Sequence, residues 1–398
     1  MIAFFINAQN VEESNLFLRK LWCELSTICP MAWQFQPVKK NNKVSIGYCN
    51  LGEVLFDYKM AGCIKNLYID NKSEDKVDEI TAAVRRAQEG KFKIFNIKLI
   101  FENNRKRVIA NSNCADLSIA VDKGENALIT NIFAYSVADV KQWVQMKIWT
   151  LRAILYEYTF QIFDLKAIVC AERPTLNKNM GDAQDDAYDR NWVDCSDIPI
   201  ADNGAIIVPQ ECLSLLSIVL KGDQHAADLD LLLNSARMLF TSQQIESGLQ
   251  FPNEPGISDI INSTMISSIE PLASFIDRRV MRCDCCGNPR YSVVAKIRTL
   301  LSKYVSLDFA KYFTKQFYSM RSSLFHEGKM ISNLTKSNAC YPLIDPLNTK
   351  EMLIPTGIVL MNLKEYSSYV FRKMIHEYYT VGIDVIEADD SVRKIQFF

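Results

Sequence analysis

The hydrophobic pattern of this 398-residue chain changes its period once, and that change limits the folds open to it. Before about residue 172, short runs alternate apolar and polar residues, which is typical of half-buried strands. After about residue 205, apolar residues recur every three or four positions, which is typical of helices with one buried face. We therefore predict the α+β class, with a mixed α/β domain at 1–172, an acidic linker or loop at 173–204, and an all-α helical bundle at 205–398.

The first part contains short candidate strands and two helical patterns. Clusters of Asn, Gly and Lys, which can turn the chain, separate the strands. One surface helix is expected at 74–88. A longer helix is expected to begin near Ser136, where Asp139 stands at the spacing of a capping pair. The candidate strands are 2–6, 44–49, 53–58, 91–101, 127–134 and 166–170.

The second part shows apolar stripes at helical spacing, and helices that each bury one face predict an antiparallel bundle. In the fourth stripe, Ser306 can cap the start of a helix, and Gly328 stands where a left-handed residue would end it. The last helix begins with Asn362 and Glu365 at the spacing of a capping box. The stripes are Leu229, Leu232, Ala236 and Leu239; Ile261, Met265, Ile269 and Leu272; Val293, Ile297, Leu300 and Tyr304; Phe309, Phe313, Phe317, Met320 and Leu324; and Leu363, Tyr366, Val370, Met374 and Tyr378.

Composition and charge exclude several classes of protein. Lys plus Arg (45) nearly balance Asp plus Glu (46), so no global positive field attracts nucleic acid or anionic lipid, and any nucleic-acid site must be local. Lys147, Arg152 and Glu157 interrupt the most apolar stretch, 143–163, which therefore predicts a buried helix and no membrane contact. The first residues lack the basic region of a signal peptide, and 12 scattered cysteines are typical of free thiols in a reducing compartment. We expect a cytoplasmic protein without a cofactor.

An arginine and a histidine stand close together at the end of the fourth helix. Arg321 and His326 are five residues apart, so their side chains diverge by about 140° around the helix and the long arginine must reach round. Histidine exchanges a proton near neutral pH and could take the proton of a ribose 2′-hydroxyl. A guanidinium can bind phosphate oxygens and stabilise a pentavalent phosphate without a metal ion. The pair is therefore a candidate site for RNA cleavage.

Three blocks of sequence around this pair resemble the Apea-like HEPN family. They are Ser268-Ile269-Glu270-Pro271-Leu272, then YSVVAKIRTLLSKY, then FYSMRSSLFHEGK, in the order of the family pattern. The resemblance covers about 205–390 and implies a homodimeric, metal-independent endoribonuclease in which the motifs of two copies meet in one cleft. Its products would carry a cyclic phosphate and a free 5′-hydroxyl. By match to the motif, the resemblance implies Arg321 and His326 as catalytic residues, Ser322 as the polar residue after the arginine, and Glu270 as an orienting carboxylate on the neighbouring helix.

The chain departs from the family pattern at one position. Glu327 separates His326 from Gly328 and adds a negative charge that could repel phosphate. A HEPN scaffold that binds RNA, a nucleotide or a protein partner without cutting therefore remains the alternative. A second pair, Arg372 and His376, falls on one face of the last helix and is interpreted as an ordinary surface or structural pair.

The stretch before the fourth helix is the most basic part of the chain and is the candidate RNA-docking surface, although a solvated face would explain it equally well. Within it, Cys283 and Cys286 form a C-x2-C pair. Tetrahedral zinc needs two further ligands, so free thiols are the favoured interpretation and no metal is expected. The candidate RNA-binding residues are Arg278, Arg279, Arg282, Arg290 and Arg298.

The expected linker carries six aspartates. Their spacing matches no known metal-binding loop, so a solvated acidic segment is favoured, and a metal-dependent nuclease that uses these carboxylates is a third alternative. Expected partners are an RNA substrate, a second copy of the chain, and a phage-derived trigger or an antitoxin. Because an always-active ribonuclease would harm its host, we assign the N-terminal domain a sensing or regulatory role in a bacterial antiphage defence or toxin system. The aspartates are Asp182, Asp185, Asp186, Asp189, Asp194 and Asp197.

Overall fold

The structure is a computed structural model of the chain, and it combines helices with antiparallel sheets, so the α+β class is confirmed. The chain folds into two compact units. Unit 1 is Met1–Asn96, Asn131–Gln145 and Cys170–Thr175; unit 2 is Ile97–Thr130, Met146–Val169 and Leu176–Phe398. The expected division at 172 and 205 stays a prediction about folding units. The residues described below are 1–28, 38–40, 43–49, 52–60, 62–71, 76–103, 107–114, 117–122, 124–171, 187–222, 229–248, 255–277, 293–329, 343–345, 348–353 and 363–382.

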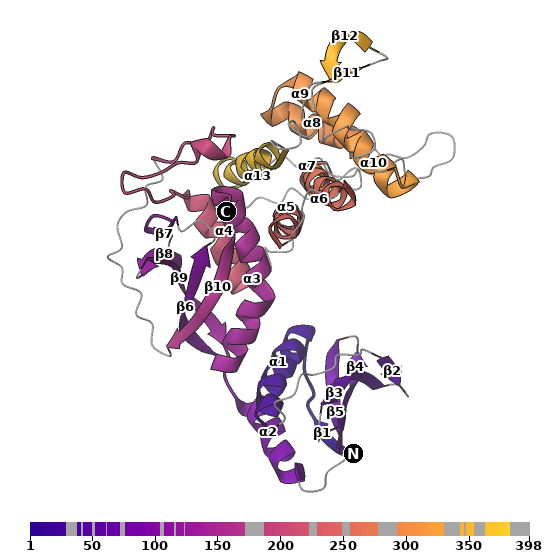
Figure 1. Ribbon diagram of the computed structural model, residues 1–398. Coiled ribbons are helices and arrows are strands. Elements are labelled where there is room, and N and C mark those ends of the chain that lie inside the picture. Colours follow the sequence, from indigo (N-terminus) through magenta and orange to yellow (C-terminus); the bar gives the residue numbers. More distant parts are fainter. Residues whose placement is uncertain are drawn as a thin grey trace. The chain divides into compact units, whose positions relative to one another are not determined.

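Unit 1 is built on an antiparallel sheet with two helices against one face (Figure 1). Paired residues such as Val54 and Ile69 lie on the same face of neighbouring strands and are fully buried under the helices. In sheet order the strands are β1 (Ile2–Phe5), β5 (Cys63–Asn71), β4 (Gly52–Met60), β3 (Lys43–Cys49) and β2 (Val38–Lys40), and the helices are α1 (Val11–Ile28) and α2 (Val77–Glu89).

Helix α1 was not expected from the sequence, although a signal for it exists. Asn10 accepts a hydrogen bond from the backbone N–H of Glu13 at 2.8 Å, and the Glu13 carboxylate accepts one from the N–H of Gln9. This reciprocal arrangement is close to a capping box, and its Asn-x-x-Glu spacing is visible in the sequence. Strands β2 and β5 were also missed, whereas the strands expected at 2–6, 44–49 and 53–58 and the helix expected at 74–88 are confirmed.

The second sheet lies mostly in unit 2. Its order is β10 (Phe163–Ala171), β6 (Lys93–Asn103), β9 (Glu125–Ala134), β8 (Leu117–Asp122) and β7 (Ser112–Cys114), so the expected strands at 91–101, 127–134 and 166–170 are confirmed. The expected capping pair of α3 (Val137–Thr159) is present too. The Ser136 hydroxyl accepts from the N–H of Asp139 at 3.2 Å, and the Asp139 carboxylate accepts from the N–H of Tyr135 at 2.7 Å.

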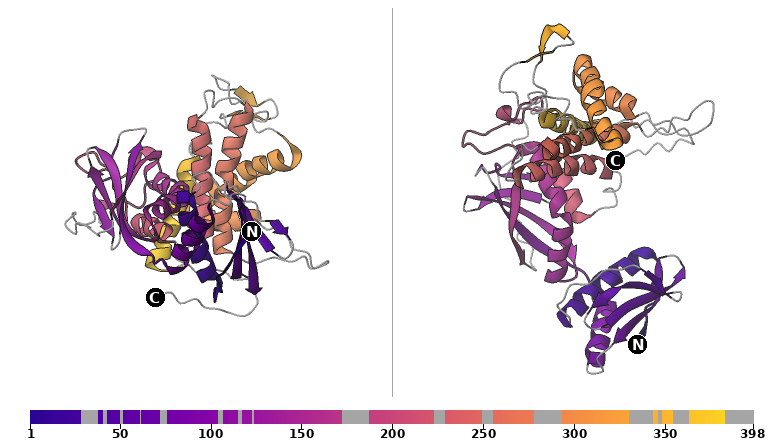
Figure 2. Two further views of the ribbon diagram at one scale, coloured as in Figure 1. Left: turned by 90° about the horizontal axis from the view of Figure 1, so that it is seen from below. Right: turned by 45° about the vertical axis from the view of Figure 1, so that its right-hand side comes forward.

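The C-terminal part of unit 2 is mainly helical, with α5 packed beside α6, α6 beside α10, and α7 beside α8 (Figures 1 and 2). Expected stripe residues such as Leu232, Ile297 and Val370 are fully buried. The described helices are α4 (Gln210–Lys221), α5 (Asp230–Gly248), α6 (Pro255–Ser267), α7 (Ile269–Ile276), α8 (Val293–Tyr304), α9 (Leu307–Tyr312), α10 (Tyr318–Glu327) and α13 (Leu363–Thr380).

Three features of unit 2 correct the sequence expectations. Residues 205–398 are not all helical, because β11 (Leu343–Asp345) and β12 (Asn348–Leu353) form an antiparallel hairpin. Helix α4 was missed because it is buried on most of its circumference and so lacks an amphipathic stripe. The expected helix through Ile261 and Leu272 is divided between α6 and α7, since Pro271 has no N–H to donate to the carbonyl of Ser267.

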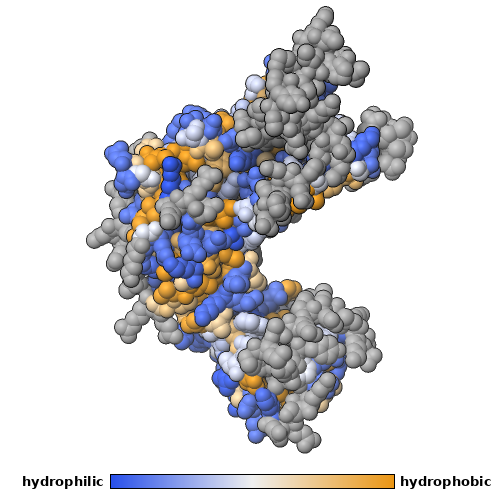
Figure 3. Space-filling view, in the orientation of Figure 1, coloured by the Kyte–Doolittle hydropathy of each residue, from blue (hydrophilic) through white to orange (hydrophobic). Residues whose placement is uncertain are grey.

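The described part of the expected linker, 187–204, is irregular and packs into unit 2 through buried Tyr188 and Trp192. None of the helices in the described ranges combines the length and the hydropathy needed to cross a bilayer. In one view of the surface, hydrophobic residues gather over the part that carries α3 and β10, where Met146 and Trp149 are partly exposed (Figure 3). The described cysteines Cys23, Cys63, Cys114, Cys170, Cys195 and Cys212 are free thiols.

Candidate active site at the end of helix α10

A helix with an internal π turn carries the candidate catalytic pair. The Ser306 hydroxyl caps α9 by accepting from the N–H of Phe309 at 3.2 Å, as expected. The helix then widens at 313–317 into a π turn, which was not expected, and continues as α10. Fully buried Phe313 and Phe317 hold this turn in the core, immediately before the candidate site. π turns inside α-helices are frequent at functional sites.

Gly328 ends α10 in the left-handed conformation that the sequence predicts, with φ of 66°. Its N–H donates to the carbonyl of Leu324 at 3.1 Å, and the N–H of Lys329 donates to the carbonyl of Ser323 at 3.2 Å. These bonds satisfy carbonyls that would otherwise lack partners at a helix end. The last turn of α10 is therefore well formed, which fixes the direction of the side chains that it carries.

Arg321 is anchored to the break between α6 and α7. One terminal nitrogen, Nη2, lies 2.9 Å from Oε1 of Glu270, and Nε donates to the hydroxyl of Ser267 at 2.9 Å. The guanidinium carbon also lies 5.5 Å from the ring centre of Tyr318 and 4.9 Å from that of Phe325. The side chain of Arg321 keeps 20% of its surface exposed, so the guanidinium is fixed in direction while part of the side chain remains open to solvent.

Burial sets the protonation of the groups around this arginine. It raises the pKa of Glu270, an effect that the positive charge of Arg321 and a hydrogen bond from Tyr318 oppose. Burial also raises the pKa of Tyr318 to about 12, helped by the nearby Glu270 carboxylate. The phenol is therefore protonated at neutral pH and available as a donor to Glu270.

His326 occupies the last turn of α10 and is exposed, as are its neighbours Phe325 and Glu327. Glu327 forms an ion pair with Lys329, which partly offsets its negative charge beside the histidine. In the described part of the chain, no hydrogen bond joins Arg321 to His326, and half-buried Ser322 bonds to neither. The structure therefore brings Glu270 and Arg321 together and leaves His326 on the surface five residues further along α10.

Two residues that the sequence reasoning missed, Ser267 and Tyr318, complete the surroundings of Arg321. Tyr318 is three positions before the arginine, a spacing that places two side chains on one helix face. Ser267 ends α6 and contacts an arginine 54 positions away, so no local pattern indicates its role. The sequence therefore held a signal for Tyr318 alone.

Arg298 is the one candidate RNA-binding residue that falls within the described ranges. It is exposed on α8, and its Nε donates to the hydroxyl of Thr314 in the π turn at 3.4 Å. The other candidates, Arg278, Arg279, Arg282 and Arg290, and the pair Cys283 and Cys286, lie outside the described residues, as does Asn362.

The second arginine and histidine pair is structural, and its arginine is buried rather than on the surface. Arg372 is 4% exposed, and its guanidinium donates to the backbone carbonyls of Glu157 at 3.0 Å and Trp192 at 2.7 Å and to the hydroxyl of Ser368 at 2.9 Å. It also stacks on the ring of Trp192, with 3.3 Å to the ring centre. Such contacts tie α13 to α3 and to the segment 187–204.

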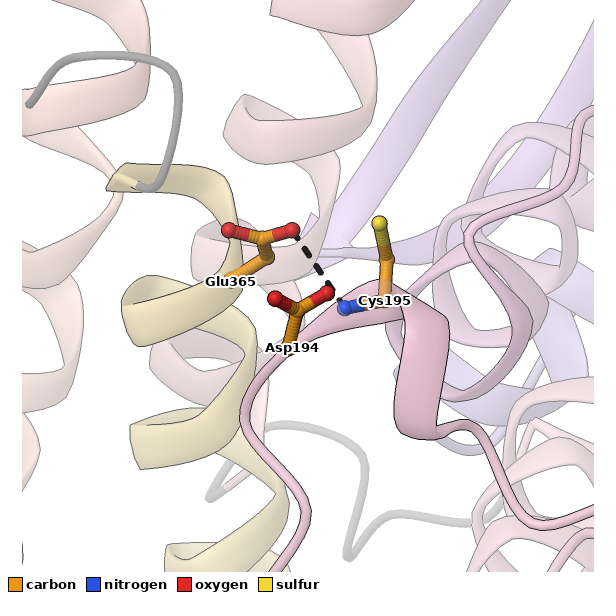
Figure 4. A group of neighbouring side chains, drawn as sticks. All are labelled: Asp194, Cys195 and Glu365. Carbon is orange, nitrogen blue, oxygen red and sulfur yellow. Dashed lines mark hydrogen bonds between the residues drawn. The ribbon is translucent and has the colours of Figure 1, made fainter. Parts of the chain in front are cut away.

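A group of potential metal ligands lies at the start of α13 (Figure 4). Asp194 and Cys195 come from the irregular segment 187–204, and Glu365 comes from the first turn of the helix. The Asp194 carboxylate accepts from the N–H of Ser196 at 2.8 Å, and this bond lowers its pKa. Glu365 accepts from the N–H of Cys195 at 3.3 Å. Both carboxylates therefore accept hydrogen bonds from backbone N–H groups, and we do not interpret the group as a metal site.

Comparison of the chain with protein-family models, with curated proteins and with solved structures found no match. The function must therefore be inferred from the residues themselves.

Proposed function

We propose that this chain is a metal-independent endoribonuclease of the HEPN type, with Arg321 and His326 as its catalytic residues. The observation that carries the proposal is the fixed guanidinium of Arg321, which Glu270 and Ser267 hold in a partly exposed side chain on the same helix as the exposed His326. Fixed cationic donors near a proton-exchanging imidazole are the groups that phosphodiester cleavage without a metal requires.

In the proposed reaction, the 2′-oxygen attacks the adjacent phosphorus and the bond from phosphorus to the 5′-oxygen breaks. An imidazole takes the proton of the 2′-hydroxyl, and a proton is returned to the leaving 5′-oxygen. Arg321 stabilises the extra charge on the phosphate oxygens. The products are a 2′,3′-cyclic phosphate and a free 5′-hydroxyl. Ser322 would contribute a hydroxyl beside the arginine.

Within one chain, no hydrogen bond joins Arg321 to His326. We therefore propose a homodimer in which these residues from two copies form one cleft. It also includes a cytoplasmic location and an N-terminal regulatory domain that responds to a phage-derived trigger or is silenced by an antitoxin. The charge of Glu270 does not prevent catalysis in this scheme, because the ion pair fixes the direction of the guanidinium and leaves its other donors free for phosphate.

A binding scaffold is the second candidate, and one observation favours it. Glu270 already neutralises Arg321, and neutralised arginines attract phosphate less strongly than free ones do. A metal-dependent nuclease built on the linker aspartates has less support, since Asp194 is engaged with the backbone.

The deciding experiment maps RNA ends after purified protein has been incubated with total RNA in EDTA. We expect cleavage by the wild type with cyclic phosphate ends, and loss of at least about 100-fold in rate for Arg321→Ala and His326→Ala. Arg85→Ala, at an exposed position on α2, is the matched control and should cleave like the wild type. Intact RNA with the wild type, after expression in cells as well as in vitro, would favour the scaffold.

A further inference from the structure

An exposed aromatic ring lies directly beside the proposed catalytic histidine. Phe325 precedes His326 in the last turn of α10 and is 58% exposed. An exposed phenylalanine alone needs no explanation. The position of this one does, because it belongs to the same helical turn as the groups proposed to act on RNA.

Arg321 fixes the orientation of this ring. Phe325 follows Arg321 by four positions, so the two side chains lie on one face of α10, and the guanidinium carbon is 4.9 Å from the ring centre. The arginine is itself held by Glu270 and Ser267. The ring is thus supported from one side by an anchored cation, while more than half of the residue remains open to solvent.

The described residues that follow Phe325 in the chain favour a nucleobase over a protein surface as its partner. The residues that follow it, His326, Glu327, Gly328 and Lys329, are all exposed and none of them is a large apolar side chain. The core of a stable protein interface is a desolvated apolar patch, which a single ring among polar neighbours does not provide. Nucleobases, by contrast, bind through single aromatic rings beside cationic side chains.

We propose that Phe325 is a stacking platform for an unpaired nucleobase next to the scissile phosphate, so that the substrate is single-stranded RNA. This inference rests on the proposed function. A base in a duplex is stacked on its neighbours and cannot cover the ring, whereas a base in a single strand can turn out and do so. Stacking at this position holds the neighbouring ribose and phosphate beside His326 and Arg321.

The test measures RNA binding by fluorescence anisotropy in EDTA, with His326→Ala as the common background to prevent cleavage. The probes are a labelled 12-nucleotide oligouridylate and a duplex of a labelled 12-nucleotide RNA. Phe325→Ala and Phe325→Leu should weaken binding of the single strand by about 5- to 150-fold, since stacking of one base contributes about 1–3 kcal/mol. Phe325→Trp should retain it, and the variants should change duplex binding less than threefold. Tyr312→Ala, at an exposed aromatic position on α9, is the matched control and should not change binding.

Equal binding by the Phe325 variants, in a protein whose histidine-containing wild type cleaves RNA, would overturn the stacking role and leave the proposed function intact. No binding and no cleavage by any form would remove the proposed function and the inference together. If Phe325→Ala instead lowers the dimer fraction in light scattering and the remaining dimer binds RNA normally, the ring belongs to an interface with a second copy and the proposal is wrong.

Discussion

Replacement of Arg372 tests whether a buried guanidinium holds α13 to the rest of unit 2. In Arg372→Ala, the backbone carbonyl of Trp192 loses the guanidinium as a donor, and that of Glu157 keeps the Ser368 hydroxyl but loses the guanidinium. A buried polar group left without a partner costs about 1–3 kcal/mol, and breaking a buried charged network costs about 3–5 kcal/mol. We therefore expect the free energy of unfolding of unit 2 to fall by about 3–5 kcal/mol.

The assay is urea unfolding followed by tryptophan fluorescence, because the guanidinium lies over the ring of Trp192 and its loss will change that emission. Lys373→Ala is the matched control. The neighbouring lysine makes one surface hydrogen bond, to Asn191, and its removal should cost less than about 0.5 kcal/mol. The loss in free energy of unfolding for Arg372→Lys should lie between those of the two alanine variants, since an ammonium group cannot make all the hydrogen bonds of the planar guanidinium. A loss below about 1 kcal/mol for Arg372→Ala would refute the reasoning.

Single groups give three further predictions. Burial raises the pKa of Glu157 to about 8, above its value in the unfolded chain, so the contribution of this group to the free energy of unfolding should be complete below pH 4.5 and be lost as the pH rises through 8. In urea unfolding across this pH range, Glu157→Gln should reduce the dependence of stability on pH. Gly328→Ala places a side chain at φ of 66° with no atom near its Cβ, so thermal unfolding should show a loss of about 1–2 kcal/mol from backbone strain alone, and an unchanged midpoint would contradict it. Tyr318→Phe removes a donor that lowers the pKa of Glu270, so the acid limb of the pH profile of RNA cleavage should move to higher pH, whereas an identical limb would exclude the tyrosine from the site.

Strand positions were predictable where one face of a strand is buried, because apolar and polar residues then alternate along the sequence. Strands such as β1 and β9, whose burial alternates along most of the strand, were found in this way. Helix α4 shows the opposite case, since burial on most sides removes the contrast between faces on which the prediction depends. The hairpin of β11 and β12 was missed because the prediction for 205–398 was based only on apolar residues at helical spacing.

Of the expected site residues, the structure brings Arg321 and Glu270 together, whereas Ser267 and Tyr318 were not expected and His326 is not bonded to either. The resemblance implied Glu270 as a neighbour of Arg321, and the two side chains do lie 2.9 Å apart. The π turn that precedes Arg321 does not change the spacing of the apolar residues, so the sequence did not indicate it. The apolar spacing also continues from α6 into α7, so it did not indicate the break between these helices. The burial of Arg372 depends on Glu157 and Trp192, which are about 200 residues away in sequence, so no local pattern could reveal it.

The π turn at 313–317 also bears on how such a helix can change during evolution. A π turn holds one residue more than an α turn, so the deletion of a single residue there would restore a regular helix. The wide turn already absorbs that residue, so everything downstream would keep its direction about the axis, and Arg321 would still lie on the side of the helix that meets Glu270. The loss of one residue between the turn and Arg321 would instead rotate the arginine by about 100° away from Glu270, so the π turn is the place in this helix where a one-codon deletion is tolerated.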